Sequence, residues 1–303
     1  MRKEFGLILI AVVFSSACVG QTDNTIQNVL TLDVVKGGVE DIAISAMVPE
    51  FARMNQDFNW QLLVRPSVMV RDFAISVYDR CVFENTGIDS FAKAELRPNN
   101  TEIFKLTYHT PQVEFERSCP VRFNASYISN ATLTTSVSVL QDTEYMLRRQ
   151  AGTLKDIQEN TWKSVSPLVL SISWGSEGQP LLDNSVNQMY IDYRNNGDGT
   201  IERLEGGPVE IQGSGATPGQ VIIQVPGNLE PSGELPCDDY TWNPYDRTLT
   251  LNRDIDFIRK EAKRSTCTFT AKATQPVDSK SLVVFATYRY AIDGSMSIPL
   301  LAR

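Results

Sequence analysis

The stretch Ser118-Cys119-Pro120-Val121-Arg122-Phe123-Asn124-Ala125-Ser126-Tyr127 places a cysteine before a strict alternation of apolar and polar side chains. The same arrangement returns later in the chain, in Thr266-Cys267-Thr268-Phe269-Thr270-Ala271-Lys272-Ala273. Alternation with a period of two is typical of a half-buried β-strand, so each cysteine is expected to face a core with the apolar residues. The repeat predicts an all-β chain made of two antiparallel β-sandwiches in tandem.

Each of these cysteines is preceded along the chain by another, Cys81 in the first copy and Cys237 in the second. Setting Cys18 aside leaves four cysteines, which can pair in three ways. Pairing Cys81 with Cys119 and Cys237 with Cys267 keeps each disulfide inside one repeat, and we predict this pattern. A zinc site is not expected, because the chain has no closely spaced pair such as C-x-x-C.

Composition limits the classes of function. The chain has 303 residues and is 42% apolar, which allows about two domains of ordinary size. Its net charge of −8 argues against a surface for nucleic acid or anionic lipid, since binding phosphates needs clustered Lys and Arg. We therefore expect no nucleic-acid partner.

The first twenty residues are expected to form a signal peptide. Arg2-Lys3 gives a charged start, and the apolar run from Leu7 to Phe14 is shorter than the roughly 20 residues that span a bilayer. Ser15-Ser16-Ala17-Cys18 resembles the lipobox of bacterial and archaeal lipoproteins, although an aliphatic residue is usual where Ser15 stands. The resemblance implies lipidation of Cys18 and anchoring at the membrane. Cleavage before Gln21, with loss of Cys18, is the alternative.

The pattern divides the chain into five parts. These are a signal peptide at 1–20, a tether at 21–40, a first β-sandwich at 41–141, a helical linker at 142–164 and a second β-sandwich at 165–303. The tether is expected because 21–40 is polar and then mixed, with a break at Gly37-Gly38. A turn at Ser129-Asn130 is expected before the last strand of the first sandwich.

Two segments carry the period of a helix. In 142–164, Leu147, Ala151, Leu154 and Ile157 recur at steps of three and four behind a cap at Asp142 or Thr143. This apolar stripe is expected to pack on one of the sandwiches, with a flexible linker as the alternative. A shorter helix is expected within 254–264, before the second cysteine strand.

Part of the second sandwich resembles a known group. The segments are Pro167-Leu168-Val169-Leu170, Gln179-Pro180-Leu181 and Met189-Tyr190-Ile191-Asp192-Tyr193-Arg194-Asn195-Asn196-Gly197-Asp198-Gly199. They resemble the opening of immunoglobulin-like modules in microbial surface proteins, particularly the cell-adhesion-related domains of archaeal and bacterial exported proteins. The resemblance covers 167–199, and the first sandwich lacks the turn. It implies a β-sandwich spacer or adhesion module without an active site.

Candidate catalytic residues are few. His109 is the only histidine, so a Ser-His-Asp triad would have to use it, and a His-rich metal site is excluded. Paired carboxylates could act on a sugar, and Asp238-Asp239 lies beside Tyr240 and Trp242, whose rings could stack on sugars. A solvated loop is the alternative for this group, because it directly follows Cys237.

One further carboxylate pair and two glycine-containing turns are also candidate binding sites. Asp254 and Asp256 form a second candidate pair. Asn195 to Gly199 is predicted to be a turn, since a calcium loop would need a different spacing and a distal glutamate. Gly213-Ser214-Gly215 is predicted to be a hairpin turn, because a phosphate-binding loop would continue into Lys-Ser/Thr and a helix. No cofactor and no metal is expected.

Three N-glycosylation sequons begin at Asn99, Asn124 and Asn130, all in the first predicted sandwich. Asn124 lies on the polar face of its strand, where a glycan would stay outside the core. The sequence therefore allows a glycoprotein.

Together these features predict a non-enzymatic, extracytoplasmic protein of the cell surface or envelope, serving as a structural or adhesive module. Its expected partners are the membrane at its N-terminus and other surface proteins or glycans. Carbohydrate binding or processing at Asp238 to Trp242 is the first alternative. Assembly by addition of a β-strand to an exposed sheet edge is the second.

Overall fold

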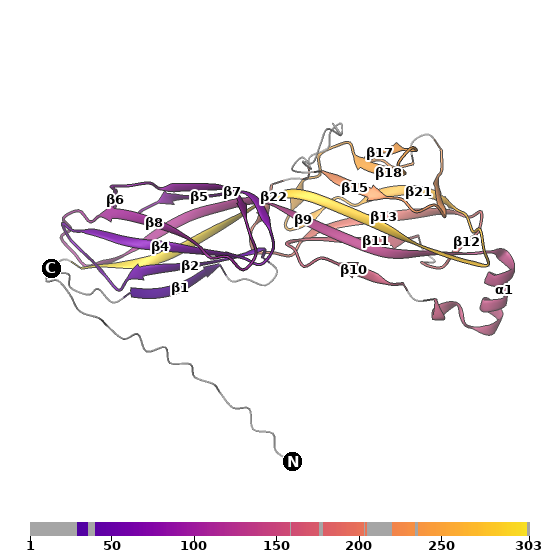
Figure 1. The fold of residues 1–303 in the computed structure, drawn as a ribbon, viewed down its shortest axis with the longest axis horizontal. Helices are drawn as coiled ribbons and strands as arrows, with labels where there is room; N and C mark the ends of the chain where they lie inside the picture. The colour runs from indigo at the N-terminus through magenta and orange to yellow at the C-terminus, as the bar shows by residue number, and fades with distance from the viewer. Residues whose placement is uncertain are drawn as a thin grey trace, which may run out of the picture.

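The structure is a computed structural model that describes residues 29–35, 40–157, 159–175, 178–202, 204, 220–233 and 236–301. Strands dominate it, and most of them pair antiparallel in sheets that pack face to face, which confirms the all-β sandwich fold. Two lobes lie end to end along the long axis (Figure 1). The signal peptide, Cys18, Gly37-Gly38 and Gly213-Ser214-Gly215 lie outside the described residues. Within these residues no helix has the length and apolar character needed to cross a membrane.

Two long strands run through both lobes (Figure 1). β9 (Arg117–Leu140) has 24 residues and β22 (Val277–Leu301) has 25, and they pair antiparallel from Leu140 opposite Val277 to Arg117 opposite Leu300. At about 3.3 Å per residue this ribbon is roughly 80 Å long. It is the common element around which both sandwiches are built.

The turn expected at Ser129-Asn130 is absent, because β9 continues through these residues. Ser129 lies opposite Tyr288 and Asn130 opposite Thr287, in unbroken register. Ser129 occupies an inward position and is buried, and its hydroxyl donates a hydrogen bond to the carboxylate of Asp41. Ser129 is therefore a buried strand residue at the junction of the two lobes, and it does not belong to a turn.

In the N-terminal lobe, the ribbon forms part of one layer of a sandwich. The facing sheet has the strand order β1 (Val29–Val35), β2 (Ile42–Pro49), β4 (Asp57–Pro66), β8 (Glu102–His109), β6 (Glu84–Asn85). Beside the ribbon lie β5 (Val70–Asp79), β7 (Ser90–Leu96) and β3 (Ala52–Arg53). Phe73 of β5 stacks on Phe104 of β8 across the core, with ring centroids 5.8 Å apart.

The presence of β1 corrects the expected tether at 21–40. Residues 29–35 pair with β2, with Val29 opposite Pro49 and Val35 opposite Ile44. Five of the seven residues of β1 are exposed, because it is an edge strand with little core to cover. That exposure explains why the segment has a mixed, tether-like composition.

In the C-terminal lobe, one sheet has the order β16 (Leu229–Pro231), β21 (Ser265–Ala271), β13 (Val186–Asn195), β20 (Glu261–Ala262), β19 (Phe257–Ile258), with β11 (Leu168–Trp174) also paired to β13. The layer that contains the ribbon adds β17 (Tyr240–Asn243), β18 (Thr248–Leu251), β15 (Val221–Gln224), β10 (Thr161–Lys163), β12 (Leu181–Leu182) and β14 (Thr200–Ile201). The buried cysteine strand β21 lies in the centre of the first sheet.

The helix expected within 254–264 is instead the hairpin β19–β20. Its two-residue turn is Arg259-Lys260, with φ of 53° and 73°. Two successive positive φ angles match the tight turns that suit the twist of paired strands. The spacing of apolar residues in so short a segment could not distinguish the two structures.

The linker expected at 142–164 does contain a helix, but the helix does not pack as predicted. α1 (Asp142–Ala151) ends where Gly152 takes a φ of 71°, and the 3-10 turn η1 (Leu154–Asp156) follows. Gln141 stands at the N-cap, without a side-chain cap bond. No residue of α1 is buried, and in the predicted apolar stripe Leu147 and Ala151 are exposed whereas Leu154 and Ile157 are half-buried.

The ribbon also changes the expected division at 142–164. β9 carries the chain out of the N-terminal lobe, and β22 brings its last described residues back, with Leu300 opposite Ala52 of β3. The interval 165–303 is therefore divided between the lobes, and the sheet that contains the ribbon spans both. Alternation predicts which residues are strands, but it does not specify their partners.

The molecule thus has two different ends (Figure 1). We call the end that holds Val29 and Leu301 the proximal pole and the opposite end the distal pole. At the proximal pole, Val29 lies opposite Pro49, and Leu301 lies opposite Arg53. At the distal pole the ribbon ends at Leu140, and β12 and α1 lie beside it.

Candidate functional site

Both predicted disulfides are present. The Cα atoms are 5.5 Å apart in the pair Cys81–Cys119 and 4.0 Å apart in the pair Cys237–Cys267. Cys119 and Cys267 are fully buried, as the alternation predicts. Cys81 is exposed instead of core-facing, because the chain turns there with a φ of 58° and its N–H bonds Asp79 at 3.1 Å. Two disulfides are typical of an oxidising, extracytoplasmic compartment.

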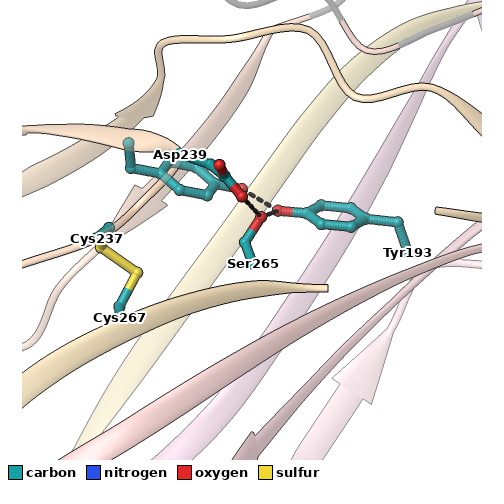
Figure 2. Close-up of a disulfide and its surroundings, with 6 residues drawn as sticks. Tyr193, Cys237, Asp239, Ser265 and Cys267 are labelled. Carbon is teal, nitrogen blue, oxygen red and sulfur yellow. Dashed lines mark hydrogen bonds between the residues drawn. A yellow bond between two sulfur atoms is a disulfide. The ribbon is translucent and has the colours of Figure 1, made fainter. Parts of the chain in front are cut away.

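Asp239, one of the predicted ligand-binding residues, is a core residue beside the second disulfide (Figure 2). Its side chain is only 2% exposed. The Oδ2 atom accepts a hydrogen bond from Ser265 Oγ at 2.8 Å, and the carboxylate also forms an ion pair with Arg253. The carboxylate is therefore occupied by partners within the protein.

Tyr240 is also fully buried, and its hydroxyl bonds that of Tyr193 across the two sheets. Tyr193 donates in turn to Ser265 Oγ at 3.3 Å (Figure 2). Burial raises the pKa of both tyrosines, so their hydroxyls stay protonated at neutral pH. The chain of hydroxyls satisfies polar atoms inside the core and ties the two layers together.

The sugar site expected at Asp238 to Trp242 is therefore not formed as predicted. Asp238 is exposed, whereas Asp239 and Tyr240 are inaccessible. Trp242 is half-buried, and the guanidinium of Arg247 lies 5.8 Å from its ring centroid. Tyr240 cannot stack on a ligand together with Trp242.

The second carboxylate pair lies in an open cavity. Asp254 and Asp256 line a space of about 590 Å³ together with Asp239, Arg253 and Glu261. Among the described residues, no group of three or more His, Cys, Asp or Glu is placed to hold a metal ion. Four acidic and two basic side chains line this space, together with Ile255, Ile258 and Ala262.

The turn predicted at Asn195 to Gly199 is confirmed, and it lies at the junction of the lobes. Asn195 Oδ1 accepts a bond from Gly197 N at 3.0 Å, and Asn195 Nδ2 donates to Gly199 O at 2.8 Å. Lys260 Nζ donates to Gly197 O at 2.6 Å. These bonds hold the turn in one conformation and leave the N–H groups of Asp198 and Gly199 to bond groups outside the turn.

One N–H group of the turn, that of Asp198, binds a carboxylate from the N-terminal lobe. Glu40 Oε1 accepts bonds from Asp198 N at 2.5 Å and from the hydroxyl of Tyr290 at 2.9 Å. The same hydroxyl accepts a bond from Gly199 N at 2.6 Å. Burial and the nearby Glu40 raise the pKa of Tyr290, which keeps its hydroxyl a donor. A side chain at position 197 would clash here, because an added Cβ would lie 2.2 Å from the Tyr290 oxygen.

A second carboxylate lies next to the first and is deeper. Asp41 is 2% exposed and accepts the hydroxyl of Ser129, while its own carbonyl accepts bonds from Ser67 N and Oγ at 2.7 and 2.9 Å. Burial, together with the neighbouring Glu40, raises the pKa of Asp41 to about 7. We call Glu40, Asp41, Ser129, Tyr290 and the turn 195–199 the interlobe latch.

His109 lies on β8, opposite Asp57 of β4. Its Nδ1 is 2.7 Å from Asp57 Oδ1, and the side chain is partly exposed. The pair is a cross-strand contact at the surface.

The three sequons differ in access. Asn99 is exposed in the turn between β7 and β8, with a φ of 62°. Asn124 and Asn130 lie within β9, where Asn124 donates to Asp293 at 3.0 Å and Asn130 accepts from Thr287 at 3.0 Å. Asn99 is therefore the position best placed to carry a glycan.

Sequence reasoning missed the interlobe latch. A signal was available in Glu40-Asp41, an acidic pair that directly precedes the strictly alternating strand β2. Burying a charged side chain at the start of a strand costs free energy unless a hydrogen-bonding or charged partner lies beside it. The partners, in β9, β22 and the 195–199 turn, come from distant parts of the chain.

The fold and the disulfides define a protein of the all-β sandwich class with two disulfide-closed cysteine repeats. No family model matches the chain, and no curated protein matches its sequence. Among solved structures, the chain is similar to a crystal structure of a mutant of Salmonella alpha-2-macroglobulin, at 10% identity and a TM-score of 0.14. The match covers 87% of this chain but 17% of that one. A likeness this weak supports no conclusion.

Proposed function

We propose that the protein is a non-enzymatic structural or adhesive module of the cell surface or envelope, held there by its N-terminus. The observation that carries the proposal is the β9–β22 ribbon, because it joins the two lobes in one continuous sheet. Two lobes that share a sheet cannot turn freely about a linker. The interlobe latch adds contacts at the junction, so a stiff, elongated body results.

The two poles support a role in display. The first described strand begins at the proximal pole, so an anchor before Val29 would leave the distal pole facing away from the membrane. The disulfides stabilise each lobe where chaperones and reductants are scarce, by about 3–4 kcal/mol each in the chain-entropy picture. We also propose that the sandwiches are immunoglobulin-like, in view of the strand β13 that runs into the 195–199 turn.

The first test concerns location and redox state. The full chain is expressed in a bacterial host, the cells are fractionated, and thiols are counted with a maleimide before and after reduction. We expect the protein in the membrane fraction with Cys81, Cys119, Cys237 and Cys267 protected. Cys18→Ser should move it to the soluble extracytoplasmic fraction with both disulfides intact. A cytosolic protein with four reactive thiols would overturn the proposal.

The second test concerns adhesion. Beads that carry the full chain by an N-terminal tag are mixed with envelope fragments of the cells that encode it. Beads with reduced and alkylated protein serve as the control. Retention by the native protein alone supports adhesion, whereas equal retention by both excludes it and leaves the structural role.

A further inference from the structure

The distal pole carries a cleft that no sequence motif indicated. It has a volume of about 700 Å³, and its lining includes residues of α1, of β12 and of the outer face of β13. We call it the distal cleft, and it is lined by Tyr145, Gly175, Gly178, Pro180, Leu181, Leu182, Ser185, Val186, Asn187, Gln188, Tyr190 and Thr268. Clefts of about 300–1,000 Å³ are the usual size for small-ligand sites.

The lining of the distal cleft has an unusual composition for this chain. None of the twelve residues is charged, although 64 of the 303 residues are (28 Lys and Arg plus 36 Asp and Glu). The polar groups are two phenols, two carboxamides and two aliphatic hydroxyls. Such groups can both donate and accept hydrogen bonds. Among the described residues that line the cleft, none would supply a counter-charge to a charged ligand that loses its hydration there.

One wall of the cleft is held in place by neighbouring side chains. Gln188 and Tyr190 stand two residues apart on β13, and Thr268 lies opposite Gln188 in β21. The Tyr190 hydroxyl donates to Gln188 Oε1 at 2.6 Å, which orients the amide so that Nε2 can donate elsewhere. The guanidinium of Arg264 lies 5.1 Å from the Tyr190 ring centroid and is itself bonded twice to Asp192, at 2.6 and 3.0 Å.

Another part of the lining comes from α1. Tyr145 is half-buried and lines the cleft, although no residue of the helix is fully buried. Two aromatic rings, together with amides and hydroxyls in the same lining, match a sugar, which has apolar C–H faces and a rim of hydroxyl groups. An aliphatic ligand would leave these polar groups unpaired.

We propose that the distal cleft binds uncharged carbohydrate, of a size of about two or three sugar rings. This inference rests on the proposed function and names the chemical class of its adhesive partner. It assigns glycan contact to the pole that lies farthest from Val29. The solvated hairpin around Trp242 has no part in it.

The test is isothermal titration calorimetry of the full chain with neutral trisaccharides of glucose, mannose, galactose and N-acetylglucosamine, and with trigalacturonic acid as a charged counterpart. We expect at least one neutral trisaccharide to bind and the charged one not to bind. Gln188→Ala and Tyr145→Ala should each weaken binding about tenfold, because each removes one ligand contact. Tyr245→Ala is the matched control, since this tyrosine is 97% exposed on another hairpin of the lobe.

A blocking variant gives a second, independent measurement. Gly175→Trp should fill the distal cleft and abolish binding, because a Cβ added there meets no atom within 4 Å. Should this variant fail to fold, Val186→Trp at an exposed position in the lining replaces it. Circular dichroism melting establishes that the variants are folded.

Three results would overturn the inference: no neutral trisaccharide binds, binding survives both Gln188→Ala and the blocking variant, or Tyr245→Ala abolishes binding. A displayed, disulfide-bonded protein without sugar binding would refute the distal cleft alone. Sugar binding by a protein found in the cytosol with free thiols would refute the proposed function alone.

Discussion

Asp41 at the lobe junction and Asp239 in the C-terminal lobe are both 2% exposed, and each accepts a hydrogen bond from a serine on a neighbouring strand. They differ in their charge partners. Asp239 is paired with Arg253, whereas among the described residues no Lys or Arg pairs with Asp41, whose nearest charged neighbour is Glu40. Equal burial therefore has different consequences for the two carboxylates.

The difference shows which parts of the core depend on pH. A buried carboxylate with a cation nearby stays charged, and one without a cation retains its proton to higher pH. The C-terminal lobe is therefore expected to hold its structure at neutral pH, whereas the junction between the lobes is expected to respond to it.

The largest expected effect concerns Asp41 itself. Its pKa in the folded protein, about 7, lies above its ordinary value of 3.8, so the folded state binds the proton more tightly than the unfolded state. The contribution of protonated Asp41 to the free energy of unfolding is therefore fully present below about pH 4. It is lost as pH rises to about 7, by up to about 4 kcal/mol. Urea unfolding between pH 4 and 8.5 should show this loss in the wild type and much less of it in Asp41→Asn.

Asp238→Asn is the control for that comparison, because its side chain is exposed and lies outside the interlobe latch. It should leave the pH profile unchanged. An Asp41→Asn protein with the wild-type profile, and no more stable than the wild type at pH 8, would contradict the assigned role.

The next effect comes from making Asp239 resemble Asp41. Arg253→Met removes the cation and leaves a buried carboxylate, which should cost roughly 3 kcal/mol at pH 8. Lys272→Met, in a half-exposed pair with Glu230, should cost less than about 1 kcal/mol at any pH. Equal losses in the two variants would mean that Asp239 does not need its cation.

The smallest effect separates the two serines. Ser129→Ala and Ser265→Ala each remove a hydroxyl donor from a carboxylate and should cost about 1–3 kcal/mol at pH 8. Only Ser129→Ala should also shift the pH profile upward, since the Ser129 bond lowers the pKa of Asp41. The measurement is the midpoint of urea unfolding across pH. A similar shift in Ser265→Ala would remove the distinction between the two sites.

Local patterns in the sequence were sufficient for the strands and the disulfides. The alternation around Cys119 and Cys267 places both residues in the core, and the nearest preceding cysteines are their partners. The same reasoning was wrong at Ser129-Asn130. A Ser-Asn pair in the sequence can mark a turn, but it can also place a serine in the core when a distant residue, here Asp41, accepts its hydrogen bond.

The sites were harder to predict than the strands. Asp239 and Tyr240 have the composition of a sugar-binding loop, but their burial depends on Ser265, Arg253 and Tyr193, which other strands supply. The distal cleft draws its lining from a helix, from turns and from three strands. No spacing within one segment could reveal it, since only the tertiary fold brings these residues together.

The ribbon of β9 and β22 has a mechanical consequence. A pull between an anchor at the proximal pole and a ligand held at the distal pole would act along the strands, at right angles to their hydrogen bonds. Under such shear many bonds share the load and must break together, whereas peeling from one end would break them singly. In the proposed arrangement, with an anchor at one pole and a ligand at the other, the ribbon would therefore bear tension along its strands.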